Sequence, residues 1–372
     1  MQFLTAFALA LAPLVAPAAD FRATLDALVE PLLKPKKSVG LVVGVRRAGE
    51  SRVYGYGKVV TPAGNRVPDG RTLFEIGSIT KTFTGVLLAE AVARGEAKFD
   101  DPIATHLPDD LVWRPHADGV PTLLDFATHR SGLPVQPPRL GVIALLAGRP
   151  GNPYSGYDRK ALAATLAGFV PDAPGRKSVY SNLGAGLLGH ALVHASKADS
   201  FNDLVRDRVT KPLTMRDTTE APDGEQRSRL ARGHDGDGEP ADPWDFASLS
   251  ACGGLRSTAD DLRSTADDLL RYAAANLGDA PTPRTPAWLA AQRPRRDDGG
   301  RRKVGLFWVT MPLPGRDEVA VWHNGGTGGY RTMVLLLPAS KSAVVVLCSA
   351  DRGLEIDRLA LAIAAALPQG AR

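Results

Sequence analysis

The sequence predicts an α/β (α+β) fold, in which an antiparallel sheet built from both ends of the chain is flanked by helices and carries an inserted, mostly helical domain. Strand-like segments lie near both ends of the 372 residues, and helical patterns fill the middle. The connections between the late strands are short, which favours antiparallel pairing. Because a two-stranded hairpin is only marginally stable alone, the early strands are expected to join the late ones.

Hydrophobic periodicity predicts the early elements. Leucine and valine recur at helical spacing over residues 20–33, which predicts a helix. Residues 38–47 and 52–60 are apolar and β-branched, and they predict two strands around a turn at residues 48–50. A second helix is expected over residues 79–95.

The rest of the chain is predicted to form helices and then strands. Helical patterns between Pro- and Gly-containing loops occupy residues 158–169, 183–197, 201–212 and 259–276. Strand patterns occupy residues 304–311, 318–323, 330–337 and 342–349, and a helix over residues 354–367 closes the chain. This order predicts a sheet domain from residues 19–98 and 300–372, and a mostly helical domain from residues 99–299.

The sequence RSTADDL occurs twice in succession, at residues 256–262 and 263–269. Each copy carries a Ser-Thr pair suited to a helix N-cap and aspartates suited to a first turn. The helix can begin at the first copy and be about 10 Å longer, at about 1.5 Å per residue. Alternatively it begins at the second copy and leaves the first as a loop. Apolar spacing is kept either way, so we expect the duplication to be tolerated.

The first 18 residues have the layout of a secretory signal peptide. Phe3 to Val15 is almost purely apolar, and the small-residue site Ala16-Pro17-Ala18 follows, with cleavage expected after Ala18. No Lys or Arg precedes the apolar run, so an uncleaved anchor is the alternative. Two prolines and the short length oppose a membrane span, which needs about 20 apolar residues. We expect an exported protein, periplasmic or secreted, with no stable membrane span after cleavage.

Composition excludes several classes of protein. The 45 basic and 40 acidic residues give a net charge of +5 with no prominent basic run, so no nucleic acid partner is expected. Two cysteines, Cys252 and Cys348, are too few for a disulfide scaffold or a CxxC metal site. An oxidising compartment permits a bridge between them, but the apolar strand around Cys348 favours two buried thiols.

No metal or other cofactor is expected. His190 and His194 have the spacing of a zinc protease helix, but position 191 is alanine rather than the required glutamate. Residues 235–240 begin like a calcium loop, but Pro240 stands where such a loop needs glycine. No G-x-S-x-G occurs either, so the nucleophile turn of the α/β-hydrolases is not supported.

The first motif with catalytic potential is Ser78-Ile79-Thr80-Lys81. It follows Gly77 and opens a helical pattern, so Ser78 is expected at a helix N-terminus with Lys81 one turn on and on the same face. Free backbone N–H groups then surround the hydroxyl, and an amine lies within reach of it. A serine is a weak nucleophile until a nearby base accepts its proton. By itself, the pattern also fits an N-capping serine with a solvated lysine.

Two further motifs add polar groups. Tyr180-Ser181-Asn182 reads as extended, where residues i and i+2 face the same way, so Tyr180 and Asn182 can share one site. A tyrosine near a cation can act as a general base. Four glycines within residues 325–329 let the backbone approach a ligand, and an edge N–H there can form half of an oxyanion hole. A structural tyrosine and a glycine-rich hairpin are the alternatives.

In this order, the three motifs resemble those of the serine β-lactamase and penicillin-binding hydrolase family, in its class C and DD-peptidase branch. The family's triplet is S-x-x-K, Y-x-N, and K-T-G or H-x-G. The likeness extends over residues 38–366, with supporting stretches at 122–134 and 253–258. The resemblance implies a β-lactamase/DD-peptidase-like fold.

The resemblance also implies roles for the motif residues. Ser78 is the acylated nucleophile. Lys81 and Tyr180 share proton transfer, with Tyr180 the favoured base toward the leaving group; which of the two takes the serine proton stays open. Asn182 positions the substrate, and the N–H groups of Ser78 and Gly326 form the oxyanion hole.

The third motif departs from that of class C β-lactamases, whose K-T-G is replaced by His323-Asn324-Gly325. His323 and Gly325 are expected to bind substrate. The histidine could bind a carboxylate when protonated, or hydrogen-bond Tyr180 when neutral. A histidine titrates near neutrality, whereas lysine is permanently charged. This weakens the expected recognition of a β-lactam carboxylate.

The sequence therefore predicts a serine hydrolase of D-alanyl-D-alanine peptides in peptidoglycan, of the DD-carboxypeptidase/endopeptidase type, that binds penicillin covalently. The alternatives are a class C-like β-lactamase and a small-ester hydrolase using the same site. A non-catalytic penicillin-binding sensor domain is a third possibility, which the intact Ser78, Lys81 and Tyr180 oppose.

Overall fold

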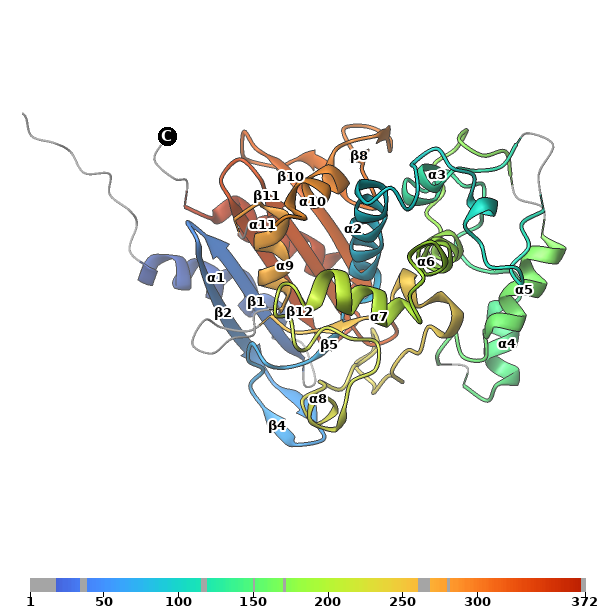
Figure 1. Cartoon of the computed structure of the whole chain (residues 1–372). Coiled ribbons are helices and arrows are strands. Elements are labelled where there is room, and N and C mark those ends of the chain that lie inside the picture. Colours follow the sequence, from blue (N-terminus) through green and yellow to red (C-terminus); the bar gives the residue numbers. More distant parts are fainter. Residues whose placement is uncertain are drawn as a thin grey trace, which may run out of the picture.

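The computed structural model describes residues 18–33, 39–114, 119–149, 151–169, 172–259, 268–279 and 282–368. Within them lies an antiparallel sheet with the order β2-β1-β12-β11-β10-β9-β8-β7 (Figure 1). Leu41 of the early strand β1 stands opposite Cys348 of the last strand, β12. This confirms the prediction that the two ends of the chain form one sheet. The strands of the sheet are β1 (Gly40–Arg47), β2 (Glu50–Gly57), β7 (Arg296–Asp297), β8 (Lys303–Val304), β9 (Val309–Pro312), β10 (Val319–Gly326), β11 (Arg331–Leu337) and β12 (Ser342–Cys348).

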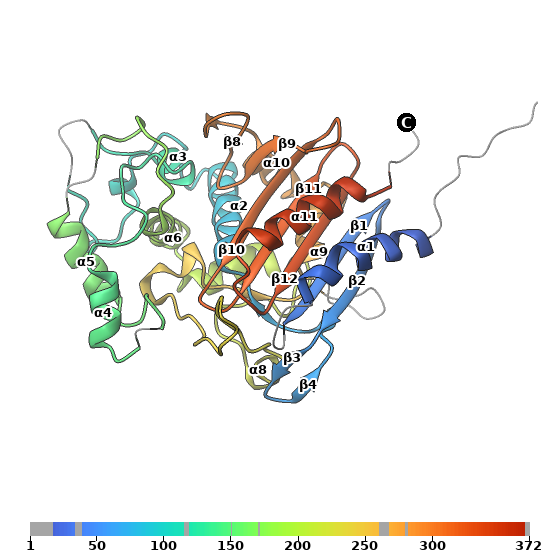
Figure 2. The same ribbon diagram turned by 180° about the vertical axis from the view of Figure 1, so that it is seen from behind.

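Helices cover both faces of this sheet. On one face lie α1 (Ala18–Leu33) and α11 (Leu354–Ala366), as Figure 2 shows. On the other face lie α2 (Thr80–Ala93), α9 (Asp268–Asn276) and α10 (Thr285–Gln292). In β12, Val344 and Val346 pack with α1 and α11, whereas Val345 packs into the larger core on the opposite face. Burial on both faces explains why this strand is a continuous apolar run rather than an alternating one.

The remaining helices lie mostly to one side of the sheet, with α6 packed against α2 (Figure 1). Ser181 caps α6 by accepting from the Gly184 N–H, and Thr122 caps α3 in a capping box with Asp125. These helices are α3 (Leu123–Ala127), α4 (Leu140–Leu146), α5 (Arg159–Gly168), α6 (Asn182–Ser196), α7 (Phe201–Val205) and α8 (Gly224–Ser228). Two short strand pairs complete the fold: β3 (Val59–Thr61) with β4 (Gly64–Arg66), and β5 (Phe74–Glu75) with β6 (Arg256–Ser257).

Most predicted elements are confirmed, and the errors have local causes. The strand predicted over 304–311 is wrong as one piece, because Phe307 has a positive φ of 62° and separates β8 from β9. The helix predicted over 201–212 passes from α7 into a π-helical turn at Arg206–Thr210. The helices α3, α4, α8 and α10 were not predicted.

The helix α9 packs on the sheet, where Leu270 lies against Gly44 of β1. It belongs to the stretch that the sequence assigned to the helical domain. We therefore propose that the sheet domain takes in α9 as well as the two ends of the chain. None of the helices among the described residues is long and apolar enough to cross a membrane. Of the expected signal peptide, only Ala18 lies within the described residues.

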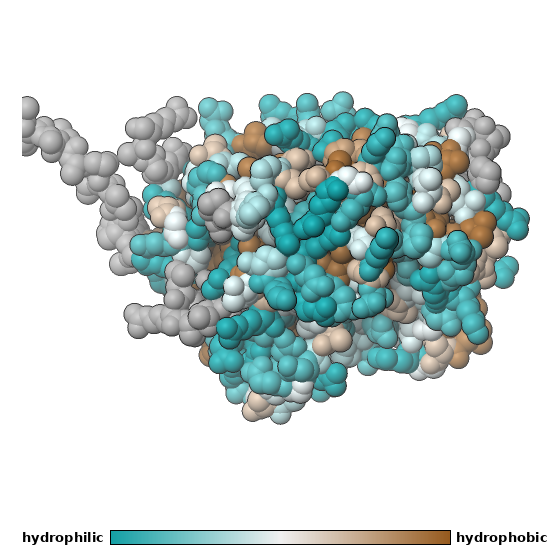
Figure 3. Space-filling view, viewed as in Figure 1, coloured by the Kyte–Doolittle hydropathy of each residue, from teal (hydrophilic) through white to brown (hydrophobic). Residues whose placement is uncertain are grey.

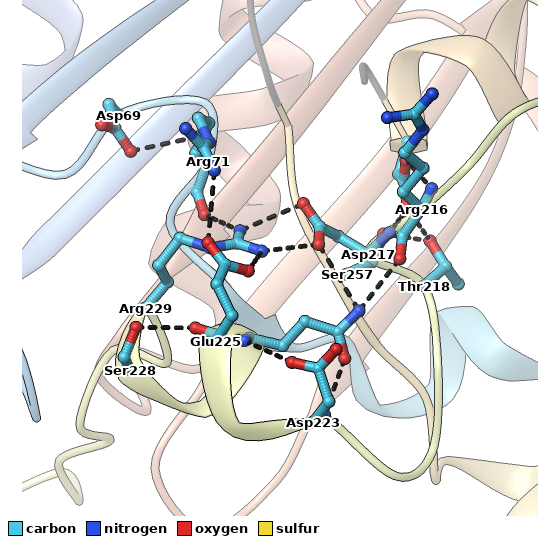
Figure 4. A network of polar contacts seen from close by, with 12 residues as sticks. Asp69, Arg71, Arg216, Asp217, Thr218, Asp223, Glu225, Ser228, Arg229 and Ser257 are labelled. Atoms are coloured by element: carbon cyan, nitrogen blue, oxygen red, sulfur yellow. Dashed lines mark hydrogen bonds and ion pairs between the residues drawn. The ribbon is translucent and has the colours of Figure 1, made fainter. Parts of the chain in front are cut away.

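A polar network holds the segment before β5 in place (Figure 4). The Arg229 guanidinium lies within 2.6 Å of Asp217 and 2.7 Å of Glu225, and it also donates to the Arg71 carbonyl. The carboxylate of Asp268, at the start of α9, accepts from the Asp217 N–H at 2.7 Å. The network thus ties α8 and α9 to the chain that leads into β5 and the motif after it.

The duplicated heptad falls partly outside the described residues, which omit 260–267. In the first copy, Arg256 and Ser257 form β6, and the second copy ends in α9. The Thr258 carbonyl accepts from the Leu269 N–H at 3.2 Å, although eleven positions separate them. The two ends of the duplicated stretch are therefore adjacent.

Deleting residues 260–266 is expected to leave folding and activity intact. The deletion restores one RSTADDL and turns the bond between Thr258 and Leu269 into an ordinary i→i+4 helical bond. A shorter connection also costs less entropy to order. We expect an unfolding temperature equal to or above that of the full chain, measured by thermal denaturation. Loss of soluble protein or a lower unfolding temperature would show that the second copy has a structural role.

Cys252 and Cys348 are buried and unpaired. Burial raises the pKa of the Cys252 thiol to about 11 and that of Cys348 to about 12. They are two inert core residues, as the apolar pattern around Cys348 predicted.

Candidate active site

A close backbone approach places Ser78. Gly77 has a φ of +51°, and a Cβ there would lie 2.8 Å from the Gly326 nitrogen. Only glycine fits such a conformation without strain. Gly325 is equally constrained, since a Cβ would lie 1.9 Å from the Ile76 carbonyl oxygen. The glycines thus let β10 lie directly against the turn that carries Ser78, at the N-terminus of α2.

The first two predicted motifs meet at the Ser78 hydroxyl. Tyr180 Oη donates to Ser78 Oγ at 2.7 Å, and Lys81 Nζ donates to the same oxygen at 2.9 Å. Lys81 Nζ also donates to Asn182 Oδ1 at 2.7 Å. The 39% exposure of Tyr180 leaves the site open to a substrate. The structure therefore brings together Ser78, Lys81, Tyr180 and Asn182 as the sequence predicted.

Lys81 is fully buried and has three acceptors. Besides Ser78 and Asn182, the backbone carbonyl of Cys252 accepts from Nζ at 2.6 Å. Three acceptors match the three donors of an ammonium group. Nζ also lies 4.8 Å from the centre of the Tyr180 ring, so the cation faces the aromatic ring as well as the serine. The Cys252 carbonyl could not be predicted from the sequence, because it comes from a segment 171 positions away.

His129 accepts hydrogen bonds from the two residues that flank Tyr180 in the sequence. Its carbonyl accepts from the Val179 N–H at 2.8 Å, and its Nδ1 accepts from the Ser181 N–H at 3.2 Å. Its ring lies 4.5 Å from the Tyr180 ring. Burial and the nearby Lys81 charge lower the pKa of His129 well below its usual value, so Nδ1 keeps the lone pair that the bond needs. This histidine was not among the site residues predicted from the sequence.

Two further side chains orient Asn182. Its Nδ2 donates to the Tyr154 hydroxyl at 2.9 Å, and that hydroxyl donates to Gln136 Oε1 at 3.0 Å. Because the amide nitrogen is directed to Tyr154, the amide oxygen is directed to Lys81. Neither Tyr154 nor Gln136 was predicted as part of the site, since they come from loops with no recognisable spacing to the motifs.

The third motif alternates between the two faces of β10. Asn324 points to α11, where its Nδ2 donates to Asp357 at 2.7 Å. His323 lies on the face toward Tyr180, with the ring centres 6.4 Å apart. Its Nδ1 lies 2.6 Å from the Asn324 carbonyl oxygen. The expectation that His323 titrates near neutrality is wrong, because burial and the Lys81 charge lower its pKa to about 3.

Comparison with known proteins agrees with this geometry. A family model described as beta-lactamase matches residues 25–367. The chain is 27% identical over 357 residues to a β-lactamase of Pseudomonas fluorescens, covering 89% of this chain and 94% of the relative. It is 30% identical over 302 residues to the D-alanyl-D-alanine-carboxypeptidase/endopeptidase AmpH of Escherichia coli strain K12, covering 78% of this chain and 74% of the relative.

Solved structures show the same fold. A class C β-lactamase superposes with a TM-score of 0.80 at 24% identity, covering 94% of this chain and 98% of that one. The D-alanine carboxypeptidase AmpC of Burkholderia cenocepacia superposes with a TM-score of 0.76 at 26% identity, covering 94% of this chain and 100% of that one. The family model spans almost all of the described fold, and the serine, lysine and tyrosine of the motifs meet at one hydroxyl. The chain therefore belongs to the β-lactamase family and is a serine hydrolase.

Proposed function

We propose that this protein is an exported DD-carboxypeptidase/endopeptidase that forms an acyl-enzyme on Ser78 with D-alanyl-D-alanine peptides of peptidoglycan. The observation that carries the proposal is the convergence of Lys81 and Tyr180 on Ser78 Oγ, at 2.9 and 2.7 Å. A hydroxyl becomes a competent nucleophile when a positioned base lies within hydrogen-bond distance. Export is proposed from the signal-like first 18 residues, and the working compartment is periplasmic or extracellular.

In the proposed acylation, Ser78 Oγ bonds to the carbonyl carbon of the scissile peptide. Its proton passes to Tyr180 Oη while Tyr180 gives its own hydroxyl proton to the nitrogen of the leaving amine, so the phenol is neutral before and after the step. Tyr180 rather than Lys81 is assigned the base role because three acceptors occupy the Lys81 ammonium. The Lys81 ammonium also faces the Tyr180 ring, 4.8 Å from its centre, so it lies beside the group that relays the proton. Water hydrolyses the acyl-enzyme by the reverse proton route.

The backbone N–H groups of Ser78 and Gly326 are proposed as the oxyanion hole. The close approach of Gly77, which directly precedes Ser78, to the Gly326 backbone supports this pairing of amides. Removing one such donor typically costs about 10²–10³ in rate. Gly325 is retained as a residue that permits this approach, and Asn182 as the group that positions the substrate amide.

A peptide substrate is proposed first because a relative that matches most of this chain is named for that activity, and the third motif lacks the permanent charge of the class C β-lactamases. With its pKa near 3, His323 is neutral at physiological pH and does not offer the cation that a lysine would. The relative AmpH is itself named a carboxypeptidase/endopeptidase. β-Lactamase activity is the second candidate, favoured by the 27% identical relative named for that activity. A small-ester hydrolase is the third.

The test is to measure D-alanine release from a D-Ala-D-Ala peptide alongside hydrolysis of a chromogenic cephalosporin. We expect D-alanine release and little cephalosporin turnover. The reverse result would assign the protein as a β-lactamase. If the protein turns over neither the peptide nor the cephalosporin but hydrolyses a small ester, it is a small-ester hydrolase.

The buried, neutral state of His323 predicts how the stability of the protein and its acylation rate depend on pH. The folded-state pKa of about 3 lies below the ordinary 6.5, so the folded protein binds this proton less tightly than the unfolded chain. The contribution of His323 to the free energy of unfolding is therefore fully present above pH 6.5 and is lost as the pH falls toward 3. Between pH 5 and 8, His323→Gln should leave the shape of the acylation–pH profile unchanged. A rate inflection near pH 6.5 that disappears in this variant would contradict the assignment.

His129 is predicted to act through Tyr180 as a positioning residue. His129→Ala removes the acceptor for the Ser181 N–H and the ring beside Tyr180, and we expect an acylation rate about 10–100-fold lower with KM little changed. His129→Asn keeps an acceptor and tolerates the positive φ of 59°, so it should recover part of the rate. If both variants lose rate only in proportion to their folded fraction, His129 has a structural role alone.

A further inference from the structure

Apart from the active site, the surface carries an open hollow of about 480 Å³ at the sheet edge formed by β7 and β8. In Figure 1 this edge is the β8 region, beside α3, and hydrophilic side chains cover that margin of the molecule in Figure 3. We refer to it as the basic hollow. It is lined by Arg130, Gly175, Pro294, Arg295, Arg296, Asp297 and Lys303.

Four of the lining side chains are cationic. Among the described residues, no ion pair involves Arg130, Arg295, Arg296 or Lys303. Arg295 lies over the Phe99 ring at 4.2 Å, and burial together with the neighbouring arginines lowers its pKa. The one acidic lining residue is Asp297. The hollow therefore carries an excess of positive charge that the protein itself does not neutralise.

The walls of the hollow come from three separate segments that are bonded together. Arg130 donates to the Gly175 carbonyl and to the Asp297 carbonyl, both at 2.9 Å. Ser178 Oγ donates to Asp298 at 2.8 Å. These bonds join the chain after α3 and the segment before Tyr180 to the β7–β8 hairpin. The Nε atoms of Arg130 and Arg295 are buried without a hydrogen-bond partner.

We propose that the basic hollow binds oxyanion groups carried on an anionic polymer substrate. Guanidinium groups bind carboxylate and phosphate oxygens in paired hydrogen bonds, which suits either source of negative charge. A water molecule takes about 30 Å³ of liquid volume, so a hollow of about 480 Å³ exceeds the needs of one small anion. A segment bearing more than one charged group fills it better.

The hollow lies close to the proposed active site. Arg130 directly follows His129, whose ring lies 4.5 Å from that of Tyr180. Gly175 precedes Tyr180 by five residues, so their Cα atoms are at most about 18 Å apart even in a fully extended chain. One polymer can therefore occupy the hollow and present a peptide bond to Ser78. This inference rests on the proposed function and assigns a substrate class to it. The substrate is a cell-wall polymer that carries anionic groups at a distance from the peptide bond that is cleaved.

The test uses the double variant Arg296→Gln/Lys303→Gln in the full chain. Both side chains are exposed, so folding should be retained. The matched control is Arg52→Gln/Lys58→Gln, which removes the same charge from exposed positions at the opposite edge of the sheet. Binding of inorganic tripolyphosphate and of poly-L-glutamate is measured by titration calorimetry at low and high salt.

We expect at least one probe to bind the wild type and the control, more weakly at high salt, and to bind the double variant at least tenfold more weakly. Tripolyphosphate alone would indicate a phosphate-bearing polymer, and polyglutamate alone a carboxylate-bearing one. KM for soluble peptidoglycan fragments should rise in the double variant, with small-ester hydrolysis unchanged. Equal binding by the double variant and the control, or no binding by the wild type, would overturn the proposal. Small-ester hydrolysis reports separately on Ser78, so this failure is distinguishable from failure of the proposed function.

Discussion

Ser78→Ala is expected to abolish covalent acylation by penicillin and to lower peptide hydrolysis by a factor of at least about 10⁴. The substitution removes the one oxygen on which Lys81 and Tyr180 converge, at 2.9 and 2.7 Å. Without it, neither group has a nucleophile to activate. Intact-mass analysis after incubation with penicillin measures the adduct, and a D-alanine release assay measures hydrolysis.

The control for this experiment is Ser196→Ala, at the far end of α6 from Asn182. It should retain the adduct and the activity of the wild type. Circular dichroism should show both variants folded. A covalent adduct that still forms in Ser78→Ala would refute the assignment of the nucleophile.

Tyr180→Phe is expected to lower the acylation rate by about 10²–10⁴, the usual range for a general acid–base group. The substitution keeps the ring that packs beside His129 and faces Lys81, so the loss measures the hydroxyl alone. The rate of adduct formation at limiting penicillin, followed by quenched-flow mass spectrometry, checks this. Tyr54→Phe, on β2, is the matched control. An unchanged rate in Tyr180→Phe would move the base role to Lys81.

The architecture was predictable because its signals are local. The apolar run that became β12 and the turn-rich hairpin of β1 and β2 both specify strands, and neither segment is stable without the other. Likewise, Ser78 and Lys81 lie one turn apart on any helix that begins near Gly77. Tyr180 and Asn182 could be placed together by the alternation of an extended segment.

The rest of the site depends on contacts between distant segments. The sequence gives no spacing by which Tyr154 could be recognised as the partner of the Asn182 amide, or the Cys252 carbonyl as an acceptor for Lys81. Burial is also a property of the folded chain, so the low pKa of His323 could not be read from its residue type. The positive φ of Phe307 that divides one predicted strand has no sequence signal, because aromatic residues rarely adopt it.

The basic hollow likewise could not be predicted from the sequence, because it too depends on contacts between distant segments. Asp297 and Asp298 separate Arg295 and Arg296 from Lys303 along the chain, and Arg130 joins them from a segment far away in the sequence. The bonds from Arg130 to the Gly175 and Asp297 carbonyls, which exist only in the folded chain, bring these charges onto one surface.

The most direct test of the central claim, that Ser78 forms an acyl-enzyme of a peptidase, is a time course of intact mass with penicillin, followed by peptide mapping. We predict one penicillin per chain, attached to Ser78 and still present after the free drug is removed. A chain that consumes penicillin rapidly without retaining an adduct would contradict the peptidase assignment. A chain that neither consumes penicillin nor carries an adduct on Ser78 would contradict the acyl-enzyme itself.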